Sequence, residues 1–256
     1  MKDPSIHGLE MSNDGIIHDC NIVVNHKCNK RCKTCIDKFL LSTDKEVTPE
    51  LVEKYISKIH RKYTNLTKEV FLLGGEPTCS SLDLLKTISE ISKDFKLEPK
   101  MSTNGLNRDK VLALKDDYDL FQITARNEDD IAFYRQIADR VTIKFNGDAD
   151  FNLEKLEWFV KASEGYFQRS INMFHTLDGS KQLCTDQRVW DLITPLRSES
   201  HLMYHVAWYK GVRIKWGSPG CTQVEKCPAS PILYPNGNYN CTWVNEDLDD
   251  YLDLDW

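Results

Sequence analysis

The sequence contains no long apolar run. None of its 256 residues lies in a stretch that approaches the ~20 apolar residues of a membrane-spanning helix. Residues 1–5 also lack the apolar core of a signal peptide. A hydrophobic content of 41% with 28% charged residues is typical of a soluble globular protein. We therefore expect a cytoplasmic protein with no membrane partner and with one sizeable core.

The sequence also lacks an excess of positive charge and an even number of cysteines. Its net charge of −6 gives no support to nonspecific binding of nucleic acid, which is driven by neutralising phosphates, although a local basic groove stays open. Nine cysteines cannot form a fully paired disulfide framework. In a reducing cytosol, clustered cysteines are more often metal ligands. Six of them form two clusters, which are Cys28/Cys32/Cys35 and Cys221/Cys227/Cys241.

The first cluster has the spacing C-x3-C-x2-C and follows the apolar run 22–24, which predicts a buried strand. Soft thiolates select zinc, copper(I) or iron–sulfur clusters. A [4Fe–4S] cluster usually takes four cysteines, so three local cysteines would leave one iron open to another ligand. Structural zinc sites more often pair their ligands in two separate halves. A small zinc site remains the alternative for this loop.

Apolar periodicity predicts strands and helices in alternation from this loop onward. Six strand–helix units in series predict a parallel sheet with helices on its outer face, and they are too few to close an eight-stranded barrel. The later strands are expected at 68–73, 97–101, 119–124, 141–145 and 170–174. The helices are expected from Thr48 and from Ser81, then at 109–115, 128–138 and 153–162.

The pattern changes after about residue 180. A helix is expected at 187–196, followed by β-structure at 201–209 and 212–216. A hairpin is expected from 232–234 to 239–241, because an Asn-Gly pair between apolar residues is a strong turn signal. We therefore expect two domains, a core over residues 1–180 and a small extension over 181–256.

A glycine-rich turn follows the strand that ends at Leu73. Its residues are Gly74, Gly75, Glu76 and Pro77, and the two glycines would let the backbone approach a ligand closely. The cysteine spacing and this turn together resemble the radical S-adenosylmethionine (radical SAM) superfamily, whose GGEP motif binds the amino group of SAM. The resemblance implies an α/β fold, namely a partial (β/α)6 TIM-type barrel with a small C-terminal β-hairpin and iron–sulfur extension.

The resemblance also implies a chemistry. Cys28, Cys32 and Cys35 would hold a [4Fe–4S] cluster whose open iron binds SAM. An electron supplied by a reductant such as flavodoxin or ferredoxin would then split SAM to a 5′-deoxyadenosyl radical. Glu76 would accept a charge-assisted hydrogen bond from the methionine ammonium.

Other residues resemble positions that contact SAM in the family, with ordinary turn or capping roles as the alternative for each. Thr34 stands where an aromatic residue often touches the adenine, and backbone groups near Ile36 would substitute for it. Thr124 and Arg126 resemble residues that bind the ribose hydroxyls and the methionine carboxylate, and a planar guanidinium suits a carboxylate. Polar residues near SAM are expected at Ser102, Thr103 and Asn104.

The second cysteine set, Cys221, Cys227 and Cys241, is spaced C-x5-C-x13-C. Residues 227–241 resemble the cysteine hairpin of SPASM and twitch extensions, which hold an auxiliary [4Fe–4S] cluster. The hairpin is one residue shorter than usual after its glycine, and no C-x2-C follows it. Cys184 is a candidate fourth ligand, and zinc or unligated cysteines are the alternatives.

The sequence thus favours a radical SAM enzyme that abstracts hydrogen from a small-molecule or nucleotide substrate. Modification of a peptide or of a nucleic-acid base is the alternative within the superfamily. A non-catalytic iron–sulfur or zinc protein is the alternative outside it. The GGEP turn argues against an electron carrier, which has no need to bind the SAM amine.

Overall fold

The computed structural model describes residues 20–32, 35, 44–62, 68–147, 150–173, 184–200, 204–217, 232–235 and 239–240. The chain divides into two compact units. The first unit comprises residues 11–119 and 224–256, and the second comprises residues 1–10 and 120–223. No helix among the described residues is both long and apolar enough to cross a bilayer.

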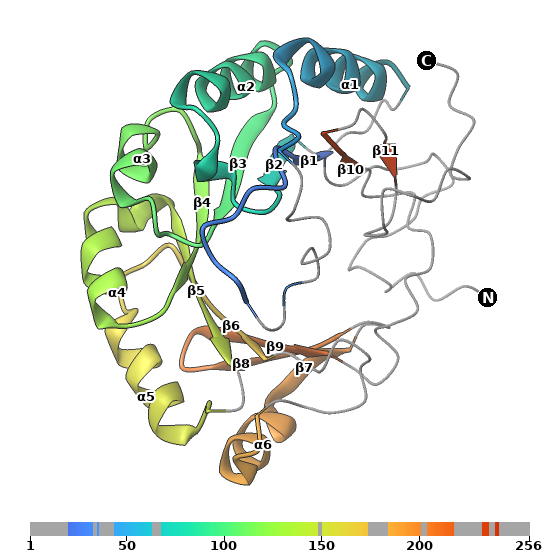
Figure 1. The fold of residues 1–256 in the computed structure, drawn as a ribbon. Helices are drawn as coiled ribbons and strands as arrows, with labels where there is room; N and C mark the ends of the chain where they lie inside the picture. The colour runs from blue at the N-terminus through green and yellow to red at the C-terminus, as the bar shows by residue number, and fades with distance from the viewer. Residues whose placement is uncertain are drawn as a thin grey trace, which may run out of the picture. The chain divides into compact units, whose positions relative to one another are not determined.

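The first unit is built on three parallel strands that alternate with helices (Figure 1). The apolar run before the cysteine loop forms the strand that was expected there. The strands are β1 (Cys20–Val23), β2 (Glu69–Leu73) and β3 (Glu98–Thr103), and the helices are α1 (Pro49–Lys62), α2 (Leu82–Asp94) and α3 (Arg108–Ala113).

The first two helices begin where their capping residues predict. The Thr48 hydroxyl accepts a hydrogen bond from the backbone N–H of Leu51 at 3.3 Å, ahead of the first helical proline. The Ser81 hydroxyl accepts one from Leu84 at 3.1 Å. Each cap satisfies an N–H group that has no partner within its helix. The predicted apolar face of α1 is buried, as shown by Val52, Tyr55, Ile56 and Ile59.

The predicted C-terminal hairpin is confirmed. Its strands β10 (Ile232–Leu233) and β11 (Tyr239–Asn240) are antiparallel. Strand β10 also pairs in parallel with β1, so that Asn21 lies opposite Ile232. The hairpin therefore extends the sheet that carries the cysteine loop. The turn residues and Cys221, Cys227 and Cys241 lie outside the described residues, and the expected domain boundary at residue 180 stays a prediction.

The second unit carries six strands of the sheet, with parallel pairing from β4 to β9 and antiparallel pairing of β8 with both β9 and β7. The order is β4-β5-β6-β9-β8-β7, and α4 and α5 lie along one side of β4–β6 (Figure 1). The strands are β4 (Leu120–Ala125), β5 (Val141–Gly147), β6 (Gln168–Met173), β7 (Arg197–Ser200), β8 (Tyr204–Tyr209) and β9 (Val212–Gly217), with helices α4 (Glu128–Tyr134), α5 (Leu153–Ala162) and α6 (Gln187–Ile193).

Aromatic contacts show which face of this sheet the helices cover. Phe145 of β5 packs 5.6 Å from Trp158 and 5.6 Å from Phe159 of α5, measured between ring centroids. Trp216 of β9 packs 6.1 Å from Trp190 of α6. Side chains alternate between the two faces of a strand. The residues between these aromatic positions therefore lie on the face opposite to α5 and α6.

Two predicted helices end earlier than expected. The helix predicted at 128–138 ends at Tyr134 and continues as the 3₁₀ segment Arg135–Arg140, in which Ile137 has a non-helical φ of −129°. The helix predicted at 187–196 ends at Ile193 and continues as the 3₁₀ segment Thr194–Leu196. Pro195 in this 3₁₀ segment has no N–H group for an α-helical hydrogen bond.

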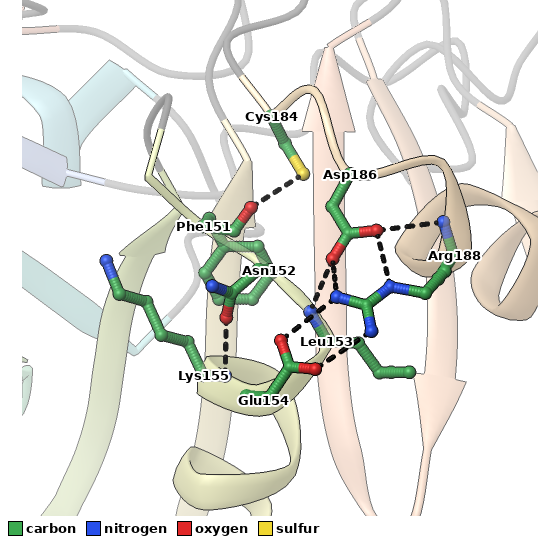
Figure 2. A network of polar contacts seen from close by, with 8 residues as sticks. All are labelled: Phe151, Asn152, Leu153, Glu154, Lys155, Cys184, Asp186 and Arg188. Atoms are coloured by element: carbon green, nitrogen blue, oxygen red, sulfur yellow. Dashed lines mark hydrogen bonds and ion pairs between the residues drawn. The ribbon is translucent and has the colours of Figure 1, made fainter.

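A polar network joins the start of α6 to the start of α5 (Figure 2). Asp186 accepts hydrogen bonds from the backbone of Leu153 and of Arg188, both at 3.0 Å. Arg188 also donates to both carboxylate oxygens of Glu154, at 2.9 and 3.0 Å. The buried Cys184 thiol donates to the carbonyl of Phe151 at 3.3 Å. This contact gives Cys184 a structural role, and its role as a ligand stays a prediction.

All six predicted strand–helix units are present in the predicted order, from β1–α1 to β6–α6. The fold class is confirmed as α/β, consistent with a partial (β/α)6 barrel of the TIM type. Two features were not expected. Strand β7 forms beside β8, and β9 continues the parallel sheet beside β6. The strands β7 to β9, which follow the last strand–helix unit, thus extend the same sheet.

Candidate cofactor site

The two glycines of the turn pack against the strand end that leads into the cysteine loop. Gly75 donates its N–H to the carbonyl of Asn25 at 2.9 Å, and a Cβ at this position would collide with the carbonyl oxygen of Lys27. A Cβ on Gly74, whose φ is +137°, would lie 2.6 Å from the oxygen of Asn25. We expected the glycines to make room for a ligand. The structure shows that they make room for the backbone of the cysteine loop.

Asn25 joins the cysteine loop to the GGEP turn. Its side chain is 0% exposed, and its amide donates to the carbonyl of Glu76 at 3.0 Å and to the hydroxyl of Ser80 at 2.6 Å. Its side-chain oxygen accepts from the N–H of Lys27 at 3.0 Å. Sequence reasoning missed this residue, because a single asparagine after a strand has no periodic signal.

The Glu76 carboxylate is buried, at 1% exposure, and accepts four hydrogen bonds. Its Oε1 atom accepts from the N–H of Thr78 at 3.1 Å, the hydroxyl of Thr78 at 2.6 Å and the hydroxyl of Thr103 at 2.5 Å. Its Oε2 atom accepts from the N–H of Asn104 at 2.6 Å. Glu76 therefore also fixes the GGEP turn to the end of β3.

No basic side chain among the described residues pairs with Glu76. All four of its donors are neutral, so its negative charge is buried without a compensating cation. Burial of an unpaired charge is costly. A carboxylate has about four acceptor positions, and Oε2 uses one of its two. The site thus retains an acceptor position and a charge that suit a cationic ligand group.

Cys28 lies close to this carboxylate. Burial raises the pKa of the Cys28 thiol, the N–H of Lys30 lowers it in part, and the nearby Glu76 raises it further. Two N–H groups face its sulfur, from the Lys30 backbone at 3.4 Å and from the Asn104 side chain at 3.9 Å. Such donors favour the thiolate that binds metals, and a bound cation reverses the local pKa preference.

The remaining thiols lie on the same loop. The N–H of Cys35 donates to the carbonyl of Cys32 at 3.3 Å, which places the two cysteines on one turn. Within the described part of the chain, no three His, Cys, Asp or Glu side chains are arranged to hold a metal ion. The donor types fit an iron–sulfur cluster. Metal binding is coupled to folding, so binding of a cluster would draw the three thiols together.

An asparagine network, formed by Asn29, Asn104 and Asn107, borders the site. The Asn104 amide donates to Asn29 at 2.8 Å, and the Asn29 amide donates to Asn107 at 3.3 Å. The Asn107 amide in turn donates to the carbonyl of Thr78 at 2.9 Å. Sequence reasoning pointed only to Asn104. The network holds the cysteine loop, the GGEP turn and the loop after β3 in contact.

The other predicted SAM-binding residues differ in what the structure shows. Pro77 is buried at the start of a short 3₁₀ segment, and Ser102 is half-buried on β3. In the second unit, Thr124 is half-buried on β4. Thr34 and Ile36 lie outside the described residues. The SAM contacts of these five residues stay predictions.

Arg126 already binds a carboxylate of its own unit. Its Nε and Nη2 atoms donate to the two oxygens of Asp130 at 2.7 and 2.6 Å, and this pairing raises the pKa of Arg126. The Arg126 guanidinium, which was expected to bind a methionine carboxylate, is thus already paired with Asp130 at the start of α4. Its role toward SAM stays a prediction.

Comparison with protein-family models gives one match, to the radical SAM superfamily, over residues 22–175. The chain belongs to the radical SAM superfamily. The match includes the cysteine loop, the GGEP turn and the strands from β1 to β6. Superfamily membership implies a [4Fe–4S] cluster and SAM as cofactors, which agrees with the donor types of the loop and with the uncompensated charge of Glu76. The match ends before the second set of cysteines.

Solved structures of radical SAM proteins resemble the chain in part. One is anSMEcpe with bound AdoMet and a Kp18Cys peptide, at 14% identity and a TM-score of 0.43, covering 60% of this chain and 50% of that one. Another is BtrN in complex with AdoMet and 2-DOIA, at 15% identity and a TM-score of 0.39, covering 51% and 57%. The matched region thus spans about half the length of these structures. Comparison with curated proteins gives no match.

Proposed function

We propose that this protein is a radical SAM enzyme that acts on a small-molecule or nucleotide substrate. Its [4Fe–4S] cluster, held by Cys28, Cys32 and Cys35, would supply the electron that cleaves SAM to the hydrogen-abstracting 5′-deoxyadenosyl radical. The protein supplies binding, orientation and the exclusion of side reactions. A reductant such as flavodoxin or ferredoxin is the expected partner, and a cytoplasmic location is expected.

The observation that carries the proposal is the buried Glu76 carboxylate, which has four neutral donors and no cation. A methionine ammonium would supply the missing positive charge and use the remaining acceptor position on Oε2. A charge-assisted hydrogen bond of this kind is stronger than a neutral one. An electron-transfer or zinc protein would gain nothing from this arrangement.

The surrounding residues keep the ligand groups in place. The Asn25 amide and the two glycines hold the GGEP turn against the cysteine loop, so the distance between Glu76 and Cys28 is set by backbone packing. Asn104 contacts both Glu76, through its N–H, and the Cys28 sulfur, through its side chain. Rigid support of this kind lowers the entropic cost of aligning a cofactor.

We further propose that Cys221, Cys227 and Cys241 hold an auxiliary [4Fe–4S] cluster in a twitch-like extension. The support is the hairpin of β10 and β11, because Cys241 follows its last paired residue, Asn240, directly. Iron analysis separates the options, with about eight irons per chain for two clusters and about four for one. Four irons with one zinc would exclude the auxiliary cluster.

The test of the main proposal is release of 5′-deoxyadenosine. Protein reconstituted anaerobically with iron and sulfide, then given dithionite and SAM, should release 5′-deoxyadenosine. Cys32→Ala should reduce the yield to the blank level, because the variant loses a cluster ligand. Exposed Lys161→Gln is the matched control and should behave as the wild type. Equal product from the wild type and Cys32→Ala would show that the cluster assignment is wrong.

A further inference from the structure

The Asn104 side chain lies between the cysteine loop and the GGEP turn. Asn104 follows β3 directly, and its amide nitrogen lies 2.8 Å from the side-chain oxygen of Asn29 and 3.9 Å from the sulfur of Cys28. Its backbone N–H donates instead to Glu76, at 2.6 Å. The side chain and the backbone of Asn104 thus have separate partners, so a substitution can remove the side-chain contacts and keep the contact with Glu76.

The orientation of the Asn104 amide is fixed by the hydrogen bonds around it. A backbone carbonyl only accepts, so the end of the Asn107 amide that lies 2.9 Å from the carbonyl of Thr78 is its nitrogen. The oxygen of Asn107 then accepts from Asn29, whose own oxygen accepts from Asn104. The oxygen of Asn104 accepts from the N–H of Leu106 at 3.0 Å. The nitrogen of Asn104 therefore faces the cysteine loop.

This nitrogen carries two N–H groups, and the cysteine loop offers an acceptor to each. One acceptor is the side-chain oxygen of Asn29, and the other is the sulfur of Cys28. The backbone N–H of Lys30 is a second donor to the same sulfur, at 3.4 Å. The Lys30 donor belongs to the loop itself, whereas the Asn104 donor comes from the loop after β3.

The buried Glu76 carboxylate gives these donors their importance. Burial raises the pKa of the Cys28 thiol, and the nearby negative charge of Glu76 raises it further. The same charge opposes the reduction of a cluster bound at Cys28, because reduction adds negative charge beside it. Hydrogen bonds to the ligand sulfurs act in the opposite direction, and they are among the factors that set the potential of an iron–sulfur cluster.

We propose that the Asn104 side chain raises the reduction potential of the [4Fe–4S] cluster by donating a hydrogen bond to the Cys28 sulfur. The presence of the cluster rests on the proposed function. The reduction is a one-electron step in which the reductant is oxidised and the cluster is reduced, and no bond forms or breaks. Asn104 acts on the cluster through Cys28 and is therefore a positioning residue.

The test is a redox titration of the anaerobically reconstituted protein, followed by the electron paramagnetic resonance signal of the reduced cluster. Asn104→Leu keeps the size of the side chain and removes its N–H groups. The equilibrium constant for reduction should fall roughly threefold to tenfold, the effect of one hydrogen bond. A tenfold fall corresponds to a midpoint potential about 59 mV lower for a one-electron couple. The titration is made without SAM, so a direct contact with SAM cannot cause the shift.

A second variant grades the effect. Asn104→Asp keeps an oxygen that can accept from Leu106, but it faces the Cys28 sulfur with a negative charge in place of an N–H group. Its midpoint potential should fall further than that of Asn104→Leu. Asn104→Asp also decides the outcome if Asn104→Leu does not hold its cluster, which iron analysis and thermal unfolding of each variant would show.

Asn107→Leu is the matched control. It removes a side chain of the same asparagine network whose hydrogen bonds connect Thr78 and Asn29. Its midpoint potential should stay within the error of the wild type. An equal fall in Asn107→Leu and Asn104→Leu would assign the effect to a loosened loop and overturn the inference. A wild-type potential in both Asn104 variants would overturn it as well.

The inference and the proposed function fail in different ways. A wild type that releases 5′-deoxyadenosine, with a potential that neither Asn104 variant changes, overturns only the inference. A wild-type cluster whose potential falls in both Asn104 variants, but which never cleaves SAM, overturns the proposed function and leaves the role of Asn104 in place. A wild type that takes up no iron overturns both.

Discussion

The Glu76 side chain of the first unit and the Lys144 side chain of the second are ionisable groups of opposite sign, and neither forms an ion pair among the described residues. In the first unit, the Glu76 anion is surrounded by neutral donors that fix its position. In the second unit, Lys144 and Arg213 lie on a sheet face without a carboxylate partner among the described residues. Charge left unpaired on folding costs stability.

The two regions also differ in rigidity. The cofactor site is held by backbone contacts and by asparagines that link three loops, whereas Lys144 and Arg213 belong to regular strands. A cofactor that is cleaved at a fixed bond benefits from the first arrangement.

The largest effect is expected at Gly75. Gly75→Ala places a Cβ against the Lys27 carbonyl, and backbone atoms cannot move aside easily. We expect a loss of about 3–5 kcal/mol in the free energy of unfolding, measured by urea denaturation, together with poor cluster incorporation.

The control for this prediction is Gly211→Ala in the second unit. Its φ of +74° is also unfavourable for alanine, but the added Cβ would meet only the end of the Arg169 side chain, which can move. We expect a loss of about 1 kcal/mol. Equal losses in the two variants would contradict the tight junction between the turn and the cysteine loop.

A smaller effect is expected at Glu76. Glu76→Gln should weaken SAM binding by roughly 1.5–3 kcal/mol, because a neutral amide loses the charged hydrogen bond. Stability should also fall, because the amide group would face donors such as the N–H of Asn104. Equilibrium titration with SAM measures the first effect and urea denaturation measures the second.

Glu69→Gln is the matched control, because Glu69 lies on β2, the strand that the GGEP turn follows. Glu69 pairs with Lys100, and its substitution should not change the affinity for SAM. If Glu76→Gln binds SAM as tightly as the wild type, then Glu76 acts only within the protein.

The smallest effect is expected at Lys144. Its pKa is about 7 in the folded protein and 10.5 in the unfolded chain, so the unfolded chain binds more protons between these pH values. The free energy of unfolding therefore rises with pH across that window. Lys144→Met should stabilise the protein at pH 6 by at least about 1.4 kcal/mol, which is one pKa unit.

This gain should shrink as the pH rises from 7 to 10, which urea denaturation at a series of pH values would show. Lys161→Met, at an exposed position, should show no such trend. A gain that is the same at every pH would mean that Lys144 is not a buried cation in the folded protein.

Much of the fold could be predicted because its signals are local. The caps at Thr48 and Ser81, the apolar alternation of the strands and the Asn-Gly turn of the hairpin all act over a few residues. The pairing of distant strands has no such signal. The register of β9 beside β6 and of β10 beside β1 depends on how faces match in three dimensions.

In the candidate site, too, local signals could be predicted and contacts between distant residues could not. The cysteine spacing and the GGEP turn pointed to the correct superfamily, because their residues are consecutive or nearly so. Asn25 and Asn107 escaped notice, since their partners lie 51 and 29 residues away. The close packing of the two glycines against the cysteine loop was not foreseen, because the backbone that approaches them follows another strand.

The pairing of β10 with β1 has a consequence for how the chain is made. Asn21 of β1 pairs with Ile232, so this edge of the strand that leads into the cysteine loop is covered only after residue 232 has been synthesised. Until then β1 presents unpaired backbone groups, which can pair wrongly with another chain. The strands β4 to β9 of the second unit are encoded between β3 and β10 and can pair with one another earlier. The pairing beside the cysteine loop is therefore completed after that of β4 to β9 as the chain leaves the ribosome.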